Sequence, residues 1–305
     1  MGHHKLLGLA LALGLFGLAS AQEKITIQHA QGETTVPVNP EVVLSFDYAS
    51  VDTLQALGVE VDGMPPLELS GVTSYASEDT LNIGSLFEPD YEAVNAANPD
   101  LIIVAARSSE AYSELSKIAP TIDLSFVGED LIGELKTNTD ILAQIFDKEA
   151  EAQTILDDID AQVETLRTQV AEGGNGLVIM TSGGSLSVLA TEGERASRGS
   201  LLYSTLGLQP TVADITAATH GEPISFEFLL AQNPDRLFVI DRDAATGESE
   251  GQPAEQVLDN PLVHETTAWQ ADQVTYLTPF DWYIITGVGL DSTKRMLTEV
   301  AAAYE

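Results

Sequence analysis

Arginine is scarce in this chain, and three of the seven arginines fall where a ligand could be held. Arg107 and Arg242 each follow a predicted buried strand, and Arg198 lies in the Gly-rich loop 191–199 ahead of a predicted helix. In open α/β sheets, ligands bind at the carboxyl ends of the strands. Guanidinium groups at that edge predict an anionic ligand held by charge-assisted hydrogen bonds. The alternative is that each arginine pairs with a nearby carboxylate, as Asp243 beside Arg242 allows.

A histidine and a tyrosine follow the same pattern. His220 lies in a loop before a predicted helix, and Tyr283 comes after a predicted strand in the run 280–283, next to Trp282. We expect Tyr283 and Trp282 to face the same sheet edge as the arginines. A lone loop histidine is more often solvated, and a tyrosine here is as often packed in the core. A bare zinc ion needs three or four N, O or S ligands, which a chain with so few histidines and no cysteine can hardly assemble.

Short apolar runs alternate with helical patterns along most of the chain. This alternation predicts parallel sheets with helices on their faces. Two of the runs flank Gly183-Gly184, which predicts a hairpin. The strands are expected at 42–46, 101–105, 121–124, 177–181, 186–189, 237–240 and 274–277, and the helices at 50–57, 110–118, 225–230 and 288–304.

A single amphipathic helix is predicted from about Lys148 to Val170. Its apolar residues recur at steps of three and four, and the Gly-rich run 173–176 ends it. We therefore expect two lobes joined by one helix. The expected division is a signal segment at 1–21, an N-terminal lobe at 22–146, the interlobe helix at 147–172 and a C-terminal lobe at 173–305.

The two halves contain a related segment. Residues 91–107 and 226–242 share seven of seventeen positions, including Asn-Pro-Asp, a glutamate near the start and an arginine at the end. Proline disfavours helical backbone at the residue before it, so each Asn-Pro-Asp should stop a helix ahead of a buried strand. The similarity favours two related lobes over a chance likeness of helix–turn–strand units.

Residues 5–21 have the layout of a cleavable secretory signal. Lys5 precedes an apolar core at 6–18 and the small residues Ala19-Ser20-Ala21. The apolar core is too short to span a bilayer. With no cysteine, disulfides, thiolate metal sites and a lipid anchor on an N-terminal cysteine are all excluded. We therefore expect an exported chain in the periplasm.

The chain is strongly acidic, with 47 Asp and Glu against 13 Lys and Arg. Nucleic acids and anionic lipids require a basic surface, so this balance excludes them as partners. The charge fits saline surroundings, where self-repulsion is screened.

Taken together, these segments resemble the periplasmic binding proteins of siderophore ABC importers, especially those that bind catecholate siderophores. The resemblance runs from about Ile25 to Tyr304. It implies two Rossmann-like α/β lobes joined by a single long helix. It departs after Ser197-Arg198, where the family commonly has an aromatic residue and this chain has Gly199-Ser200. The motifs that carry it are Ser197-Arg198, Thr219-His220-Gly221, Val239-Ile240-Asp241-Arg242, Asp281-Trp282-Tyr283 and the run from Gly287 to Ser292.

The resemblance implies capture of a ferric siderophore of the catecholate type. One possible form is a tetradentate catecholate, which leaves two coordination positions of the iron open. His220 and Tyr283 match the residues that complete the coordination of Fe(III). Ferric iron prefers oxygen donors and accepts imidazole. The remaining matches are Arg107, Arg198 and Arg242 around the anionic chelate, Tyr48 and Trp282 as further ligand contacts, and Glu92 and Glu227 as contacts to an inner-membrane ABC permease.

The expected protein is a monomer without a permanently bound cofactor and without catalytic activity. Two alternatives stay open. A cobalamin- or haem-binding protein would share the fold but needs fewer clustered arginines. An exported hydrolase finds little support, because Gly183-Gly184-Ser185 is not a nucleophile elbow and no HExxH motif occurs, although a Ser–His–Asp arrangement with His220 would assemble only in space.

Overall fold

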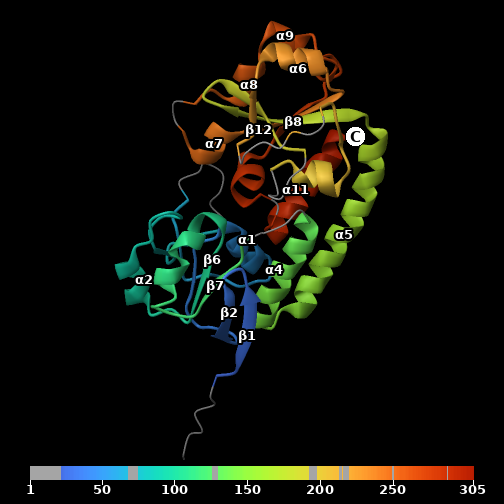
Figure 1. Ribbon diagram of the computed structural model, residues 1–305. Coiled ribbons are helices and arrows are strands. Elements are labelled where there is room, and N and C mark those ends of the chain that lie inside the picture. The colour runs from blue at the N-terminus through green and yellow to red at the C-terminus, as the bar shows by residue number, and fades with distance from the viewer. Residues whose placement is uncertain are drawn as a thin grey trace, which may run out of the picture.

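The computed structural model confirms a two-lobed α/β protein with a long helix along one side (Figure 1). It describes residues 22–67, 75–125, 130–191, 198–212, 215, 220–248, 251–286 and 288–305. The expected signal segment 1–21 lies outside the described residues. Within the part of the chain that the structure describes, no helix is both long and apolar enough to cross a membrane.

The N-terminal lobe is built on a parallel sheet with the strand order β5-β4-β3-β6-β7. Its central strands are buried on both faces, which is why they appear in the sequence as unbroken apolar runs. Beside the sheet lies an antiparallel hairpin that the sequence analysis did not predict, β1 (Lys24–His29) with β2 (Gly32–Pro37). The strands are β3 (Val43–Ser45), β4 (Gly63–Met64), β5 (Leu81–Asn82), β6 (Leu101–Val104) and β7 (Thr121–Asp123), and the helices are α1 (Tyr48–Ala56), α2 (Tyr91–Ala97), η1 (Ala106–Ala111), α3 (Tyr112–Leu115) and α4 (Leu131–Phe146).

The C-terminal lobe has a mixed sheet with the order β11-β9-β8-β12-β13. β8, β12 and β13 are parallel, whereas β9 returns antiparallel from β8 through Gly183 and Gly184, both at positive φ. The predicted hairpin is therefore confirmed. The strands are β8 (Asn175–Ser182), β9 (Ser185–Val188), β10 (Gln209–Pro210), β11 (Glu222–Ile224), β12 (Arg236–Asp241) and β13 (Val274–Leu277). The helices are η2 (Leu201–Thr205), α6 (Phe226–Gln232), α7 (Arg242–Thr246), α8 (Ala254–Leu258), α9 (Pro261–His264), α10 (Thr267–Gln270), η3 (Phe280–Ile285) and α11 (Leu290–Ala303), of which η2 and η3 are π-helical turns.

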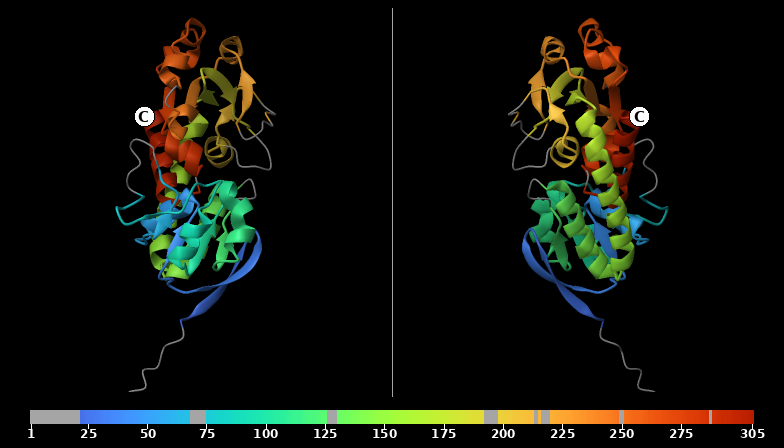
Figure 2. Two further views of the ribbon diagram at one scale, coloured as in Figure 1. Left: turned by 90° about the vertical axis from the view of Figure 1, so that its left-hand side faces the viewer. Right: turned by 90° about the vertical axis from the view of Figure 1, so that its right-hand side faces the viewer.

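The long helix α5 spans Glu149–Glu172 and runs alongside both lobes (Figure 2). Its 24 residues give a length of about 36 Å at about 1.5 Å per residue. The predicted apolar stripe is the buried face, because Ile159, Val163, Leu166 and Val170 all belong to one core cluster. This face packs against α4 and α11, so α5 is held by elements from both ends of the chain.

The repeated segment ends α2 and α6 in the same way. Asn98 and Asn233 both take the left-handed conformation that often ends a helix, and the proline that follows cannot continue the helix. The aspartate that follows each proline then fixes the start of a neighbouring strand in the sheet. Asp100 accepts two backbone N–H groups just before β3, and Asp235 accepts the N–H of Asn175 at the start of β8. The predicted helix stops are confirmed, and the same motif also ties each strand to its neighbour.

A buried ionic network connects the C-terminal helix α11 to the N-terminal lobe. Arg295 of α11 donates to both carboxylate oxygens of Asp281 in η3, at 2.9 and 2.7 Å. It also donates to Asp52 of α1 at 3.1 Å and to Tyr75 at 2.9 Å. Asp52 is almost wholly buried and accepts the N–H of Ser292 as well. Burial raises the pKa of Asp52, and its bonds to that N–H, Tyr75 and Arg295 oppose the rise.

Replacing Arg295 by methionine should loosen this connection. The substitution leaves Asp52 and Asp281 buried without their cation, which costs several kcal/mol for a wholly buried pair. Since the Arg295 side chain is about half exposed, we expect a loss of about 2–3 kcal/mol in the free energy of unfolding. Urea unfolding at neutral pH measures it. Lys294→Met, which breaks only an exposed 3.9 Å pair with Asp158, is the control and should cost under about 1 kcal/mol. Equal losses in the two variants would contradict the role of the network.

Candidate functional site

The site is organised around Tyr283, in the π-helical turn η3. The Tyr283 side chain is buried, and its phenol oxygen meets two of the predicted residues. Nε of Arg242 donates to it at 3.1 Å, and Nε2 of His220 lies 3.2 Å away. Arg242 is the first residue of α7, directly after β12, so it stands at the carboxyl end of that strand as predicted.

The other two predicted arginines contact the backbone and ring of the same tyrosine. The guanidinium carbon of Arg198 lies 4.0 Å above the centre of the Tyr283 ring, a cation–π contact. Arg198 also donates to the Tyr283 carbonyl at 3.3 Å. Arg107 reaches across from the N-terminal lobe and donates to the carbonyls of Tyr283 and Ile284 at 3.2 and 3.1 Å. The structure therefore brings five of the seven predicted ligand-site residues together, from both lobes, around Tyr283.

The local backbone explains how Arg107 is directed there. Ala106, between β6 and Arg107, has φ of 44°, a left-handed conformation that alanine rarely adopts. Its N–H is held by the Ser125 hydroxyl at 2.8 Å, and the Ser108 hydroxyl donates to the Phe46 carbonyl. These bonds fix a sharp turn at the end of the strand. The helix η1 begins at this turn, and its second residue, Arg107, is thereby directed toward the other lobe.

The nearby carboxylate of Asp243 forms a long ion pair with Arg242 but no hydrogen bond. Asp243 lies 3.8 Å from the Arg242 guanidinium, beyond the usual length of a hydrogen bond. It is bound instead by the Gly183 N–H at 2.7 Å. Arg242 directs its second contact to the Ser182 hydroxyl at 3.0 Å. Of the two interpretations of Arg242 left open by the sequence, the geometry favours a cation directed into the cluster.

Burial and mutual repulsion set the protonation states. Burial, reinforced by Arg107 and Arg242, lowers the pKa of Arg198 to about 10, which leaves it charged at neutral pH. The pKa of His220 is lowered below its ordinary value, first by burial and then by the three arginines. Its imidazole is therefore neutral at pH 7. A neutral imidazole and a phenol at the centre of three cations form a site for an anionic partner.

Two further expected ligand contacts, Trp282 and Tyr48, have buried side chains, and their role as ligand contacts stays a prediction. The Trp282 side chain has no exposed surface, and its indole N–H donates to Glu299 at 2.7 Å. It points into the core because the turn η3 directs it away from Tyr283. Tyr48 is also buried: its hydroxyl donates to the Pro65 carbonyl, and its ring packs at a centroid distance of 6.2 Å against Phe280. Burial raises the pKa of Tyr48 to about 12, and the nearby Arg107 opposes this rise.

The two glutamates expected to contact a permease occupy equivalent places. Glu92 and Glu227 are the second residues of α2 and α6, helices that lie one on each lobe (Figure 1). Both glutamates are exposed. Hydrogen bonds from its own backbone N–H and from Ser225 lower the pKa of Glu227. Both carboxylates are thus positioned at the surface, and their role stays a prediction.

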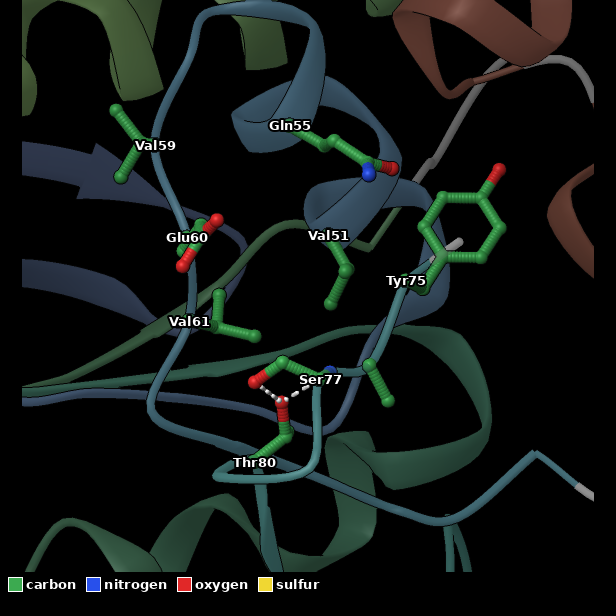
Figure 3. A pocket seen from close by; sticks show the side chains of 9 residues that line it. Val51, Gln55, Val59, Glu60, Val61, Tyr75, Ser77 and Thr80 are labelled. Atoms are coloured by element: carbon green, nitrogen blue, oxygen red, sulfur yellow. Dashed lines mark hydrogen bonds between the residues drawn. The ribbon is translucent and has the colours of Figure 1, made fainter. Parts of the chain in front are cut away.

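The N-terminal lobe also has a small cavity apart from this site. It measures about 90 Å³ and is bordered by Val51, Gln55, Glu60 and Tyr75, with Ser77 and Thr80 hydrogen-bonded to each other at its edge (Figure 3). Pockets for drug-sized ligands are typically about 300–1,000 Å³, so this cavity is too small for a chelate. Among the described residues no group of three or more His, Cys, Asp or Glu is placed to hold a metal ion.

The lowered pKa of His220 can be checked by titration. We expect the imidazole to titrate below its ordinary value of 6.5, and Arg242→Gln to raise the midpoint by removing one of the neighbouring cations. Histidine ring signals in NMR spectra recorded across pH give the midpoint. Arg167→Gln, on α5, is the control and should leave it unchanged. A midpoint at or above 6.5, or one that Arg242→Gln does not move, would contradict this electrostatic account.

Comparison with known proteins places the chain. The periplasmic binding protein family model matches residues 43–279. The petrobactin-binding protein YclQ of Bacillus subtilis is 38% identical over 95% of this chain and 91% of its own length. The ferric-anguibactin-binding protein FatB of Vibrio anguillarum is 32% identical over 92% of this chain and 88% of its own. The crystal structure of the catecholate-siderophore binding protein VctP of Vibrio cholerae is 30% identical, with a TM-score of 0.83 over 92% of this chain and all of that one.

The agreement extends over nearly the whole chain and includes the elements that carry the Tyr283 cluster. On this evidence the chain belongs to the periplasmic binding protein family.

Proposed function

We propose that this protein binds a ferric siderophore outside the inner membrane and delivers it to an ABC permease. The observation that carries the proposal is the convergence of three guanidinium groups, an imidazole and a phenol on one point between the lobes. The relatives named for petrobactin, ferric anguibactin and catecholate siderophores support the ligand class. The family is one of binding proteins, and we propose that the chain catalyses no reaction.

The five residues divide the work of binding. Ferric iron prefers oxygen donors, so the Tyr283 phenolate is a strong ligand and the neutral His220 imidazole an acceptable one. Their donor atoms lie 3.2 Å apart, close to the about 2.9 Å between adjacent ligands on an octahedral ion with bonds of about 2.0–2.1 Å. The two residues therefore suit a tetradentate catecholate that leaves two neighbouring iron positions open.

The arginines serve the charge of the chelate. A ferric catecholate carries residual negative charge, which Arg107, Arg198 and Arg242 would neutralise through charge-assisted hydrogen bonds. Arg242 also donates to the phenol oxygen at 3.1 Å, which places a cation beside the atom that would bind iron. Arg107 and Arg198 now donate to the carbonyls of η3, and a bound chelate would compete for these donors. Haem or cobalamin needs fewer clustered arginines, so most of the positive charge of these three side chains would have no counter-charge on the ligand.

The location and the lobes follow the same proposal. We place the mature chain in the periplasm, working with an inner-membrane permease. We take residues 22–146 and 173–305 as the lobes that close on the ligand and 147–172 as the helix between them. The His220 imidazole bonds the Tyr283 phenol, so it is occupied by this partner and not by a serine nucleophile such as a hydrolase would need.

Tryptophan fluorescence tests the ligand class. The chain has two tryptophans, and Trp269→Phe leaves Trp282, the sequence neighbour of the proposed iron ligand. We expect saturable quenching of Trp282 by ferric petrobactin or another ferric catecholate. Tyr283→Phe and His220→Ala should each weaken binding about tenfold or more, since even outer-shell changes at metal sites cost about 10–100-fold. Quenching by haem or cobalamin alone would overturn the ligand and keep the fold. Hydrolysis of simple esters by the purified chain would refute a pure binding role.

The arginines make a separate prediction. A hydrogen bond to a charged group contributes about 1.5–3 kcal/mol, so Arg107→Ala, Arg198→Ala and Arg242→Ala should each lower chelate affinity about 10–100-fold. Titration calorimetry with the same ferric catecholate measures the affinities. Arg167→Ala is a matched control, because Arg167 bonds Glu164 and the Thr205 carbonyl on α5 and η2, outside the site. Unchanged affinity in all three cluster variants would remove the arginines from the ligand site.

A further inference from the structure

The large apolar side chains exposed in the described part of the chain are confined to one short stretch. They are Leu81, Phe87 and Tyr91, with exposed fractions of 40%, 72% and 41%. All three lie within eleven consecutive residues of the N-terminal lobe, at the edge strand β5, in the loop that follows it and at the first residue of α2. We call these three residues the apolar patch. Single exposed apolar residues are ordinary, but three within one short stretch of a strongly acidic chain point to an interaction site.

The loop that carries Phe87 is a rigid hairpin. The Asp90 N–H donates to the Ile83 carbonyl, and Gly84 and Pro89 form a β-bridge. The Ser85 hydroxyl accepts the N–H groups of Phe87 and Glu88, at 3.3 and 2.9 Å. The tip is therefore held in one shape before any partner arrives, which reduces the entropy lost on docking.

Glycine and neighbouring side chains reinforce this shape. Gly84 has φ of 98°, and a Cβ there would clash with the Asp90 nitrogen and the Glu88 carbonyl. Leu86 packs inward against the core of the lobe, whereas its neighbour Phe87 stays exposed. The hairpin thus anchors one apolar residue and presents the next to solvent.

The charge around the apolar patch identifies the kind of partner. From residue 25 to residue 106 the sequence has no Lys or Arg but thirteen Asp and Glu. The carboxylates next to the patch are those of Glu78, Asp79, Glu88, Asp90 and Glu92. A second copy of this chain would bring the same negative charge, so like-charge repulsion opposes self-association. The complementary surface must be cationic around an apolar recess.

Among the residues that the structure describes, the equivalent surface of the C-terminal lobe lacks these features. Phe226 matches Tyr91 in the repeat but is packed against the core of its lobe. The residues ahead of it form β11, which pairs with β9 and leaves no free hairpin. The two lobes therefore present related glutamates, while the apolar patch belongs to one lobe.

We propose that the apolar patch is an anchor that docks the N-terminal lobe on a basic, apolar-lined surface of the permease. This inference rests on the proposed function and adds to it an asymmetric contact. Aromatic residues surrounded by polar groups are the usual centres of binding energy in protein interfaces. Phe87 inserts into the recess, and the surrounding carboxylates pair with permease cations. The docking orientation is set because the matching aromatic of the C-terminal lobe, Phe226, packs against its own core.

The test uses the permease with its ATPase subunits in nanodiscs and the mature chain, both ligand-free and loaded with a ferric catecholate. Phe87→Ser should weaken docking about tenfold or more, and Phe87→Ser with Tyr91→Ser further, while chelate affinity stays at the wild-type value. Phe87→Leu keeps the apolar surface and should dock nearly as well as wild type. Phe87 is largely exposed, so the variants should fold; thermal unfolding verifies this.

Wild-type docking by Phe87→Ser would overturn the anchor. Self-association of the wild-type chain that Phe87→Ser abolishes would also overturn it, in favour of a second copy. Docking of the ligand-free chain is measured separately. If the wild-type chain does not bind the chelate, this result would therefore count against the proposed function and not against the anchor.

Discussion

The contacts made by the turn η3 are the constraint on which the rest of the structure depends. On one side, its Tyr283 and Ile284 carbonyls accept guanidinium groups from the N-terminal lobe and from the loop before η2. On the other side, its Asp281 is bound in a bidentate manner by Arg295 of α11. The six residues of η3, Phe280–Ile285, are thus contacted by guanidinium groups on both sides. The phenol of Tyr283 is positioned because the backbone that carries it is held at both faces.

This arrangement concentrates positive charge in a chain whose net charge is −34. The acidic exterior repels an anionic chelate at long range, whereas the arginines of the site, of which Arg198 is buried and Arg107 and Arg242 are half-buried, attract it at short range. Salt screens exposed charges over about 10 Å at 0.1 M and leaves buried pairs less affected. Saline medium therefore weakens the repulsion more than the attraction. The same exterior favours a cationic protein partner, so the composition that opposes the ligand at a distance assists docking.

The connection between the lobes is stiffer than one helix would make it. α5 spans both lobes, and α11 packs against α5 and α1 while Arg295 bonds Asp52 in the N-terminal lobe. Covalent continuity is supplied by α5, but noncovalent contacts of η3 and α11 add a second link. Large hinge motions need residues that absorb backbone changes, and helices offer few of them. We expect ligand exchange to involve small shifts around η3.

The sequence by itself determined the local elements and the order of the chemical groups. Apolar runs marked the strands, Asn-Pro-Asp marked the ends of α2 and α6, and the arginines after β6 and β12 marked a ligand edge, because each pattern reflects backbone preferences within a few residues. The resemblance to the binding-protein family added the expected role of His220 and Tyr283 as iron ligands. Tertiary structure alone decided where the side chains point. Trp282 turns into the core beside Glu299, Arg107 crosses to the other lobe, and Phe87 stays in solvent while Leu86 packs against the core. These directions depend on contacts between segments far apart in sequence, and no local pattern encodes them.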